Sequence, residues 1–227
     1  MIYIYQRQIN MEKTNYIPAL RFNWLTKLYN PLIAFTMPEL KFKSALIEQA
    51  NILPHHHVLD FGVGTATLSL LVRKTQPECA IDGVDVDEKI VKIAKEKVKK
   101  EKAQIMITKY DGIVLPYADN SFDRVITSLV FHHLDKHQKL NSLKEIKRVL
   151  KPNGELHIAD WGKAANPIMR GLFYLVQLLD GFKTTTDNVK GLLPSYIDST
   201  GFSNIANTTN YSTIFGTLSL YKSSVKK

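Results

Sequence analysis

From Val58 onward, short runs of apolar residues alternate with longer stretches in which apolar residues recur at helical spacing. The short runs predict strands at 57–61, 80–85, 104–108, 123–129 and 155–160. Between them, helical patterns occupy 64–75, 87–101 and 136–150. Asp135 is placed to cap the last of these helices, and Pro152 with Gly154 follows its end. This alternation with short connections predicts an α/β fold: a doubly wound, mostly parallel sheet with helices on both faces.

Three parts of the chain lie outside this alternation. Residues 13–52 predict helices interrupted by prolines, which would form an N-terminal helical cap. After the last core strand, PIMRGLFYLVQLL predicts an apolar helix and KTTTDN a polar loop. Two β-runs near 204–212 and 214–222 are so close that an antiparallel hairpin is favoured. We therefore expect a single domain, divided into a cap at 1–52, a cofactor-binding core at 53–162, a substrate-cap insertion at 163–200 and a C-terminal hairpin at 201–227.

Composition places the chain among globular proteins. Of its 227 residues, 44% are hydrophobic and 22% charged, and no apolar run reaches the roughly 18 residues of a membrane span. The first residues lack the basic and apolar regions of a signal peptide. Cys79 is the single cysteine, which excludes an internal disulfide and suits a reducing compartment. We expect a cytoplasmic protein.

The formal net charge is +9, and eight lysines lie between Val86 and Lys109. A basic face of this kind can attract RNA, anionic lipid or an acidic substrate. The alternative is a solvated helix whose apolar stripe, Ile90, Val91, Ala94 and Val98, faces the core. No aromatic residues are interleaved with the lysines, so we favour the solvated face over a nucleic-acid interface.

The stretch VLDFGVGTATLSLLV, residues 58–72, places an acid and two glycines between a strand and a helix. Gly62 and Gly64 fit part of a dinucleotide-binding fingerprint, but Thr67 occupies the place of its third glycine. No Gly-Lys pair follows, which excludes a P-loop. Asp60 would repel a pyrophosphate and attract an ammonium group. The turn therefore predicts a ligand that carries a positive charge.

Two further acids follow neighbouring strands. Asp85 closes the second predicted strand, 25 residues after Asp60, a spacing suited to binding ribose hydroxyls. Asp111 follows the third strand, where it could accept a hydrogen bond from an adenine amino group. The structural alternatives are that Asp60 caps the following turn and that Asp85 caps the helix predicted at 87–101.

Four segments in series resemble class I S-adenosylmethionine-dependent methyltransferases: VLDFGVGTA (58–66), GVDVDEKIVKIAKEK (83–97), KYDGIVLPYADNSFDRVITSLVFHHL (109–134) and EIKRVLKPNGELHIAD (145–160). The resemblance implies a seven-stranded sheet that ends in an antiparallel hairpin, with S-adenosyl-L-methionine as cofactor. More loosely, the stretch from Tyr29 to Thr65 resembles ubiquinone and menaquinone biosynthesis methyltransferases.

The resemblance implies specific cofactor contacts. They fall on Asp60, Gly62, Gly64, Asp85, Val86, Asp111, Gly112, Ser128 and Leu129. The glycine turn with Asp60 would hold the amino-acid end of the cofactor, and Asp85 would bind both ribose hydroxyls. Val86 would pack on the adenine, Asp111 would bind its amino group near Gly112, and Ser128 or Leu129 would line the methionine portion. Ala66 stands where the family usually has a third glycine, so we expect slight crowding there.

Methyl transfer from a sulfonium mainly requires alignment of the nucleophile and exclusion of water. A base is needed only when the acceptor keeps its proton near neutral pH. His132 and His133 follow the fourth predicted strand and are candidate bases; the alternative is a purely local structural role. The run His55 to His57 predicts loop residues rather than metal ligands, because no cysteine or acid cluster completes a site. We expect no metal.

The acceptor pocket is expected outside the core, in the aromatic and apolar segments 13–52 and 163–200. Its candidate lining residues are Tyr16, Trp24, Tyr29, Phe173 and Tyr174; packing within the helical cap is the alternative. These segments favour methyl transfer to a small apolar or aromatic acceptor, such as a quinone or a lipid. The alternatives are an RNA or protein methyltransferase that docks through the lysine-rich helix 87–102, and a non-catalytic cofactor-binding module. Peripheral contact with a membrane is compatible with the sequence.

Overall fold

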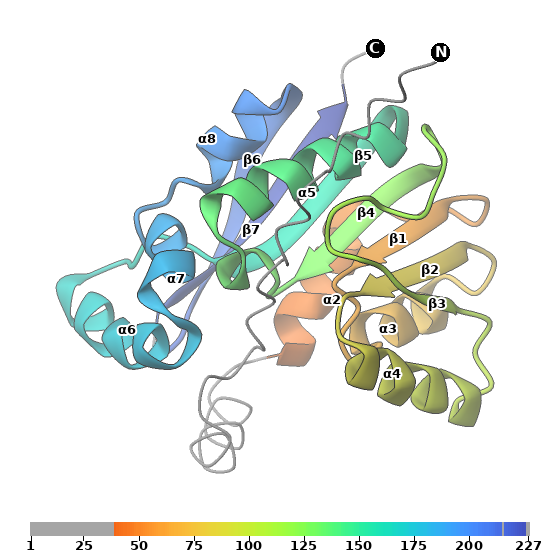
Figure 1. The fold of residues 1–227 in the computed structure, drawn as a ribbon, viewed down its shortest axis with the longest axis horizontal. Coiled ribbons are helices and arrows are strands. Elements are labelled where there is room, and N and C mark those ends of the chain that lie inside the picture. The colour runs from red at the N-terminus through yellow and green to blue at the C-terminus, as the bar shows by residue number, and fades with distance from the viewer. Residues whose placement is uncertain (1–38, 215, 226–227) are drawn as a thin grey trace, which may run out of the picture.

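The computed structural model describes residues 39–214 and 216–225, which form a central sheet covered by helices (Figure 1). The strands are β1 (His57–Phe61), β2 (Ala80–Asp85), β3 (Met106–Lys109), β4 (Phe122–Ser128), β5 (Leu150–Trp161), β6 (Phe202–Ser212) and β7 (Thr217–Val225). The helices are α2 (Glu39–Ala50), α3 (Thr67–Thr75), α4 (Glu88–Lys100), the 3-10 helix η1 (Phe131–His133), α5 (Lys136–Val149), α6 (Pro167–Asp180), α7 (Phe182–Val189) and α8 (Leu193–Ser199).

The sheet has seven strands in the order β3-β2-β1-β4-β5-β7-β6. Strands β1 to β5 pair in parallel, whereas β7 runs antiparallel to β5 and β6 antiparallel to β7. The expected doubly wound α/β fold with a C-terminal antiparallel hairpin is therefore confirmed. Because a parallel pair needs a crossover, a helix links most successive strands of the core.

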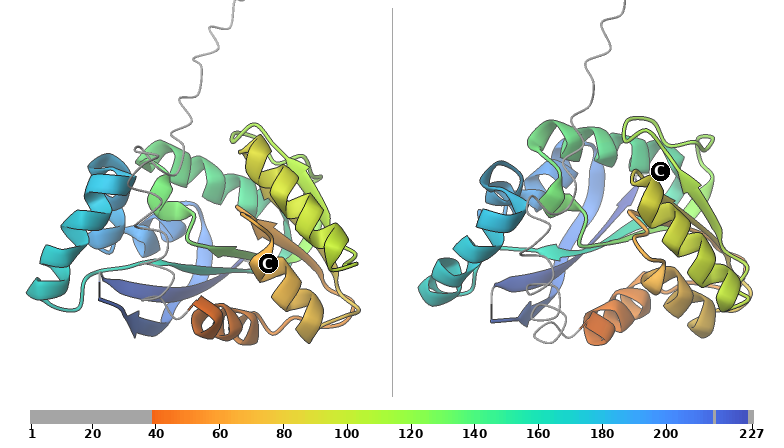
Figure 2. Two further views of the ribbon diagram at one scale, coloured as in Figure 1. Left: turned by 90° about the horizontal axis from the view of Figure 1, so that it is seen from below. Right: turned by 60° about the horizontal axis from the view of Figure 1, so that its bottom comes forward.

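Helices cover both faces of the sheet (Figure 2). The central strand β1 is apolar on both sides, and its successive side chains point to opposite faces. Val58 packs in a cluster with α2 and α3, and the adjacent Leu59 packs in a second cluster with α5 and α8. Both side chains are fully buried. The short run HVLDF thus supplies both layers of the core at once.

Local capping and amphipathic patterns behave as the sequence predicts. Asp135 caps α5 through a capping box in which its carboxylate accepts from the Gln138 N–H and the Gln138 side chain accepts from the Asp135 N–H. On α4, Val91, Ala94 and Val98 are buried. Between them Lys92 and Lys95 are exposed, as expected for a solvated helix face, whereas the half-buried Lys97 donates to the Thr67 hydroxyl at 2.9 Å.

The predicted polar loop KTTTDN is wrong, because these residues form most of α7. Thr184, Thr185 and Asn188 are buried there. The helix lies against η1 and β5, and the fully buried Lys139 of α5 donates a hydrogen bond to the Thr184 carbonyl at 2.7 Å. Tertiary contacts thus stabilise a helix that its polar composition does not predict.

Other boundaries also shift. The helix predicted from 64 begins only at Thr67, because Gly62, Gly64 and Ala66 all have positive φ. The last strand begins at Thr217 rather than 214, and α8 was not predicted. Of the expected N-terminal cap, α2 lies within the described residues and the rest of the segment lies outside them.

Replacing Gly83 with alanine is expected to destabilise the fold by about 1–3 kcal/mol. Gly83 is in the middle of β2, and a Cβ there would lie 2.6 Å from Val63 Cγ2 and 3.0 Å from Ile107 Cδ1. Gly171 on α6 is a matched control, since its Cβ would meet no atom within 4 Å. Gly171→Ala should stabilise by about 0.5–1 kcal/mol. Urea denaturation of both variants checks the prediction, and an unchanged midpoint for Gly83→Ala would contradict it.

Candidate cofactor and acceptor site

The site lies at the carboxyl edge of the parallel strands, the edge at which open α/β sheets bind their ligands. Asp60 is near the end of β1, Asp85 ends β2 and Ser128 ends β4. These strands are neighbours in the sheet, so the residues expected to hold the cofactor come to one edge. A hollow of about 290 Å³ lined by Arg73 and Lys102 lies instead at the opposite edge, and none of Asp60, Asp85 and Ser128 lines it.

The glycine turn after β1 is fixed by the neighbouring strand. The N–H groups of Gly62 and Val63 both donate to the Val84 carbonyl, at 2.9 and 2.8 Å. Gly62 has φ +72°, and a Cβ on it would lie 2.3 Å from Cγ2 of Val130. Gly64 has φ +53°, yet a Cβ there would meet nothing within 4 Å. Protein atoms therefore enclose the first glycine, while the second faces open space.

Ala66 replaces the third glycine of the family pattern at a position of strained backbone. It is fully buried and precedes α3 with φ 60° and ψ 23°, in the left-handed region. For a residue with a Cβ this conformation costs about 1–2 kcal/mol. The expected effect was side-chain crowding, whereas the structure shows a backbone conformation that glycine would adopt without strain.

Asp85 connects the turn to the start of α4. Its Oδ2 accepts from the Gly64 N–H and its Oδ1 from the Asp87 N–H, both at 3.0 Å. Burial raises the pKa of Asp85, and these N–H donors partly oppose the shift. The N-cap of α4 is Asp87, whose carboxylate accepts from Lys89 and Ile90. Asp85 is therefore not the helix cap, and it holds the glycine turn directly.

Asp60 lies beneath the turn rather than at its surface. Its side chain is 1% exposed, and its Oδ2 accepts from the Ser69 hydroxyl of α3 at 2.6 Å. Burial raises the pKa of Asp60 to about 6, with the Ser69 hydrogen bond acting in the opposite direction. The Asp60 carboxyl group therefore titrates close to neutral pH, and a nearby cation would lower its pKa.

The next two segments along the edge carry Val86, Asp111 and Gly112. A Cβ on Gly112 would lie 3.3 Å from Cγ1 of Val86, so the loop after β3 touches the residue after β2. Asp111 is exposed, and its Oδ1 accepts from the N–H groups of Ile113 and Val114. These bonds lower its pKa and keep it charged. Val86 and Gly112 are therefore brought together, as expected of residues that share one ring of a ligand.

The end of β4 shows two features that are typical of ligand sites. The Ser128 hydroxyl is buried and has no hydrogen-bond partner among the described residues. Leu129 has φ +59°, a left-handed conformation held by its N–H bond to the Ala159 carbonyl at 2.8 Å. Unpaired buried polar atoms and strained backbone cluster at functional sites because the surrounding structure bears their cost.

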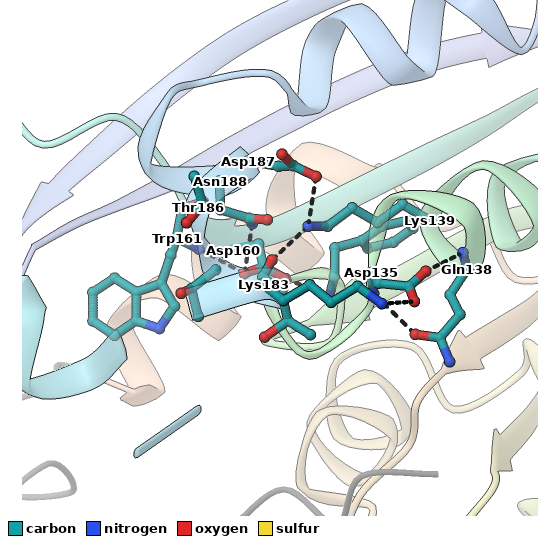
Figure 3. A network of polar contacts seen from close by, with 12 residues as sticks. Asp135, Gln138, Lys139, Asp160, Trp161, Lys183, Thr186, Asp187 and Asn188 are labelled. Atoms are coloured by element: carbon teal, nitrogen blue, oxygen red, sulfur yellow. Dashed lines mark hydrogen bonds and ion pairs between the residues drawn. The ribbon is translucent and has the colours of Figure 1, made fainter. Parts of the chain in front are cut away.

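Beyond β4, a buried network centres on Asp160 at the end of β5 (Figure 3). Its Oδ2 accepts from the Phe131 N–H at 2.7 Å, and its Oδ1 lies 2.8 Å from His132 Nδ1. The Asn188 amide of α7 donates to the same Oδ1 at 3.3 Å and to the Trp161 carbonyl at 3.0 Å. Although burial favours the neutral acid, His132 and the Trp161 N–H hold the pKa of Asp160 below its usual range.

Asp160, Asn188 and Lys139 belong to the site although none of them is predicted from the sequence. Asp160 closes the HIAD run, and an acid at the end of a predicted core strand is the signal that could have found it. Asn188 and Lys139 carry no such signal, because α7 was not predicted and a lysine in an amphipathic helix normally points to solvent.

The two histidine candidates have different surroundings. His132 is 3% exposed and pairs with Asp160. His133 packs its ring 3.9 Å from that of His132. Burial, and secondarily the His132 charge, lowers the pKa of His133 to about 3. His133 is therefore neutral at physiological pH and a poor proton acceptor.

The aromatic candidates for the acceptor pocket separate as well. Phe173 is 2% exposed and packs edge-on against Trp161 at 5.4 Å, which favours the core-packing alternative. Tyr174 is 49% exposed, with the Arg170 guanidinium 4.2 Å from its ring centre. Tyr16, Trp24 and Tyr29 lie outside the described residues.

Comparison with known proteins agrees with this geometry. A family of methyltransferase domains matches residues 58–154. A demethylmenaquinone methyltransferase of Thermus thermophilus is 27% identical over 149 residues, which cover 66% of this chain and 64% of the relative. A ubiquinone/menaquinone biosynthesis C-methyltransferase of Cupriavidus metallidurans is 26% identical over 168 residues, covering 74% of this chain and 67% of the relative.

The fold also matches solved structures. One is a S-adenosylmethionine-dependent methyltransferase from Aquifex aeolicus, with a TM-score of 0.59, 21% identity, and coverage of 89% of this chain and 97% of that one. The match to the Thermus relative spans less than two thirds of that protein's length. The matched segment contains the glycine turn, Asp60 near the end of β1, Asp85 at the end of β2 and Asp111 after β3. Residues 58–154 thus match a methyltransferase domain, and the chain is similar in sequence and fold to S-adenosylmethionine-dependent methyltransferases.

Proposed function

We propose that this protein transfers a methyl group from S-adenosyl-L-methionine to a small apolar or aromatic acceptor of the quinone or lipid class. The observation that carries the proposal is the joint placement, at one sheet edge, of Asp85, the open turn at Gly64 and the unpaired Ser128 hydroxyl. The acceptor class is supported by the names of the curated relatives, which act on quinone precursors, and by the apolar segment that follows β5.

The residues present fit such a cofactor. Asp85 would accept from the ribose hydroxyls; burial raises its pKa, and these hydroxyl donors would stabilise its charged form. Gly64 offers an approach that no side chain obstructs. Val86 and Gly112 would enclose the adenine, with Asp111 at its rim. Ser128 would gain in the methionine portion the partner that its buried hydroxyl lacks.

When bound, the cofactor supplies an electrophilic methyl group on a sulfonium, and the protein needs no metal or covalent intermediate to activate it. The task of this chain is to hold donor and acceptor in line and to keep water away. η1 and α7 stand at the edge where the acceptor would enter, and the Asp160 network fixes both relative to β5.

Of the two candidate bases, His132 has the suitable partner. Asp160, 2.8 Å from Nδ1, fixes the ring orientation and stabilises the protonated imidazole, as in other His–carboxylate pairs. An acceptor that loses a proton during the transfer, such as a phenol or a ring carbon that carries hydrogen, would require this group, whereas a thioether acceptor would not. We therefore assign proton acceptance to His132 rather than to His133.

The proposal is tested by incubating the pure protein with methyl-labelled cofactor and a cell extract, and then partitioning the label. We expect counts in the organic phase that are lost with Asp85→Asn. Counts in RNA or protein would overturn the small-acceptor proposal and make the α4 lysines the docking surface. Cofactor binding without transfer to any fraction, with quinone precursors added, would indicate a non-catalytic module.

Asp85→Asn is expected to weaken cofactor binding by about 10- to 100-fold, because hydrogen bonds to a charged acceptor contribute about 1.5–3 kcal/mol. Asp82→Asn is the matched control, since it lies on the same strand but bonds His57 instead. Isothermal titration calorimetry measures both variants, and thermal melting verifies that they remain folded. Equal affinities for the two variants would contradict the assignment.

Cofactor affinity should rise with pH between 5 and 7. In the free protein the pKa of Asp60 is about 6, above its ordinary 3.8, so the group is mostly protonated at pH 5 and ionised at pH 7. A cation bound at the turn favours the ionised form. Binding at pH 5 should therefore be about ten-fold weaker than at pH 7. Calorimetry at the two pH values measures the difference, which Asp60→Asn should abolish; equal slopes in both proteins would refute the link.

A further inference from the structure

Helix α6 is apolar on both its inner and its outer face. Phe173 and Val176 point inward and are buried. On the outer side Ile168, Leu175 and Leu178 are exposed by 77%, 52% and 60%. A helix that is apolar all round is normally buried on all sides. Among the described residues nothing covers this outer face, and it is the largest group of exposed aliphatic side chains on one helix.

Aromatic residues border the outer face, and basic residues occur near it in the sequence. Tyr174 on α6 and Phe182 at the start of α7 are each 49% exposed, with ring centres 6.3 Å apart. Basic residues occur before, within and after the two helices: Lys163, Arg170, Lys183 and Lys190, of which Lys183 pairs with Asp135 at 3.3 Å. The segment has two acids, and one of them, Asp187, already pairs with the buried Lys139 at 3.6 Å.

We propose that the outer face of α6, together with Phe182, docks on an anionic phospholipid bilayer and lies in the plane of its interface. An apolar helix face with aromatic residues at its edge and basic residues nearby is typical of interfacial helices. With 14 residues, α6 is about 21 Å long, too short to cross a bilayer. No helix in the described part of the chain is long and apolar enough to do so.

Charge favours a bilayer over a second copy of this chain. The formal net charge is +9, so two copies repel one another, whereas an anionic surface attracts the protein. Insertion of Leu175 and Leu178 would remove from water the apolar surface that the fold leaves exposed.

The position of α6 gives the docking a role. The helix follows the carboxyl end of β5, and α7 after it is tied to Asp160 at the same edge. A bilayer against α6 would lie next to the proposed acceptor entrance, so an acceptor dissolved in the membrane could enter without crossing water. This role rests on the proposed function, whereas bilayer binding itself does not.

The test is co-sedimentation of the 227-residue protein with phosphatidylcholine vesicles, with and without phosphatidylglycerol. We expect binding to the anionic vesicles that falls by about ten-fold or more in a Leu175→Gln, Leu178→Gln double variant. The control is Ile93→Gln with Met106→Gln, which changes two side chains of similar exposure, 47% and 63%, on α4 and β3. This control variant should bind as the wild type does. Thermal melting verifies that both variants are folded.

Three results would overturn the proposal: no wild-type binding to anionic vesicles, equal loss in both variants, or a dimer in light scattering that only the α6 variant dissociates. Binding that appears only after removal of residues 1–38 would also overturn it, since the chain's own N-terminal segment would then cover the face. The readout is independent of catalysis. Vesicle binding without methyl transfer would support docking and count against the proposed function. Methyl transfer to a soluble acceptor without vesicle binding would overturn docking and leave the proposed methyl transfer intact.

Discussion

The buried carboxylate of Asp160 joins three segments that are far apart in the sequence. It accepts hydrogen bonds from the backbone of η1 and of β5 and from the Asn188 side chain of α7, and it pairs with His132. A buried charge is costly unless it is paired and fully hydrogen-bonded, so these segments must stay together for the charge to be tolerated. The carboxyl edge of the sheet therefore has one arrangement of η1 and α7, and the proposed acceptor site depends on it.

A second carboxylate, Asp85, does the same for the cofactor side. It binds the backbone of the glycine turn and of the start of α4, which fixes two loops from adjacent strands relative to one another. The turn itself is strained at Ala66, and Leu129 across the edge is strained as well. The hydrogen bonds of the turn to Val84 and of Leu129 to Ala159 hold these conformations in place.

The fold by itself does not decide the reaction, because one fold hosts many functions. The proposed methyl transfer rests on particular residues: an open glycine, the Asp85 carboxylate that binds the glycine turn, and an unpaired hydroxyl at the end of β4. The apolar outer face of α6 adds a feature that the cofactor site does not need, and it connects the proposed acceptor class to the place where such a molecule dissolves.

The sequence by itself determined the core, since the alternation of strands and helices, the glycine turn and the acids at 60, 85 and 111 depend on local periodicity and spacing. It could not reveal α7, because KTTTDN is polar and becomes a helix only where Lys139 and Asp160 meet its buried groups. Nor could it show that His132 pairs with the Asp160 carboxylate while His133 does not. It also could not show that Phe173 is buried while Tyr174 is exposed, since adjacent residues differ only in what the folded chain places beside them. These choices belong to the tertiary structure, because burial and pairing are set by segments distant in sequence.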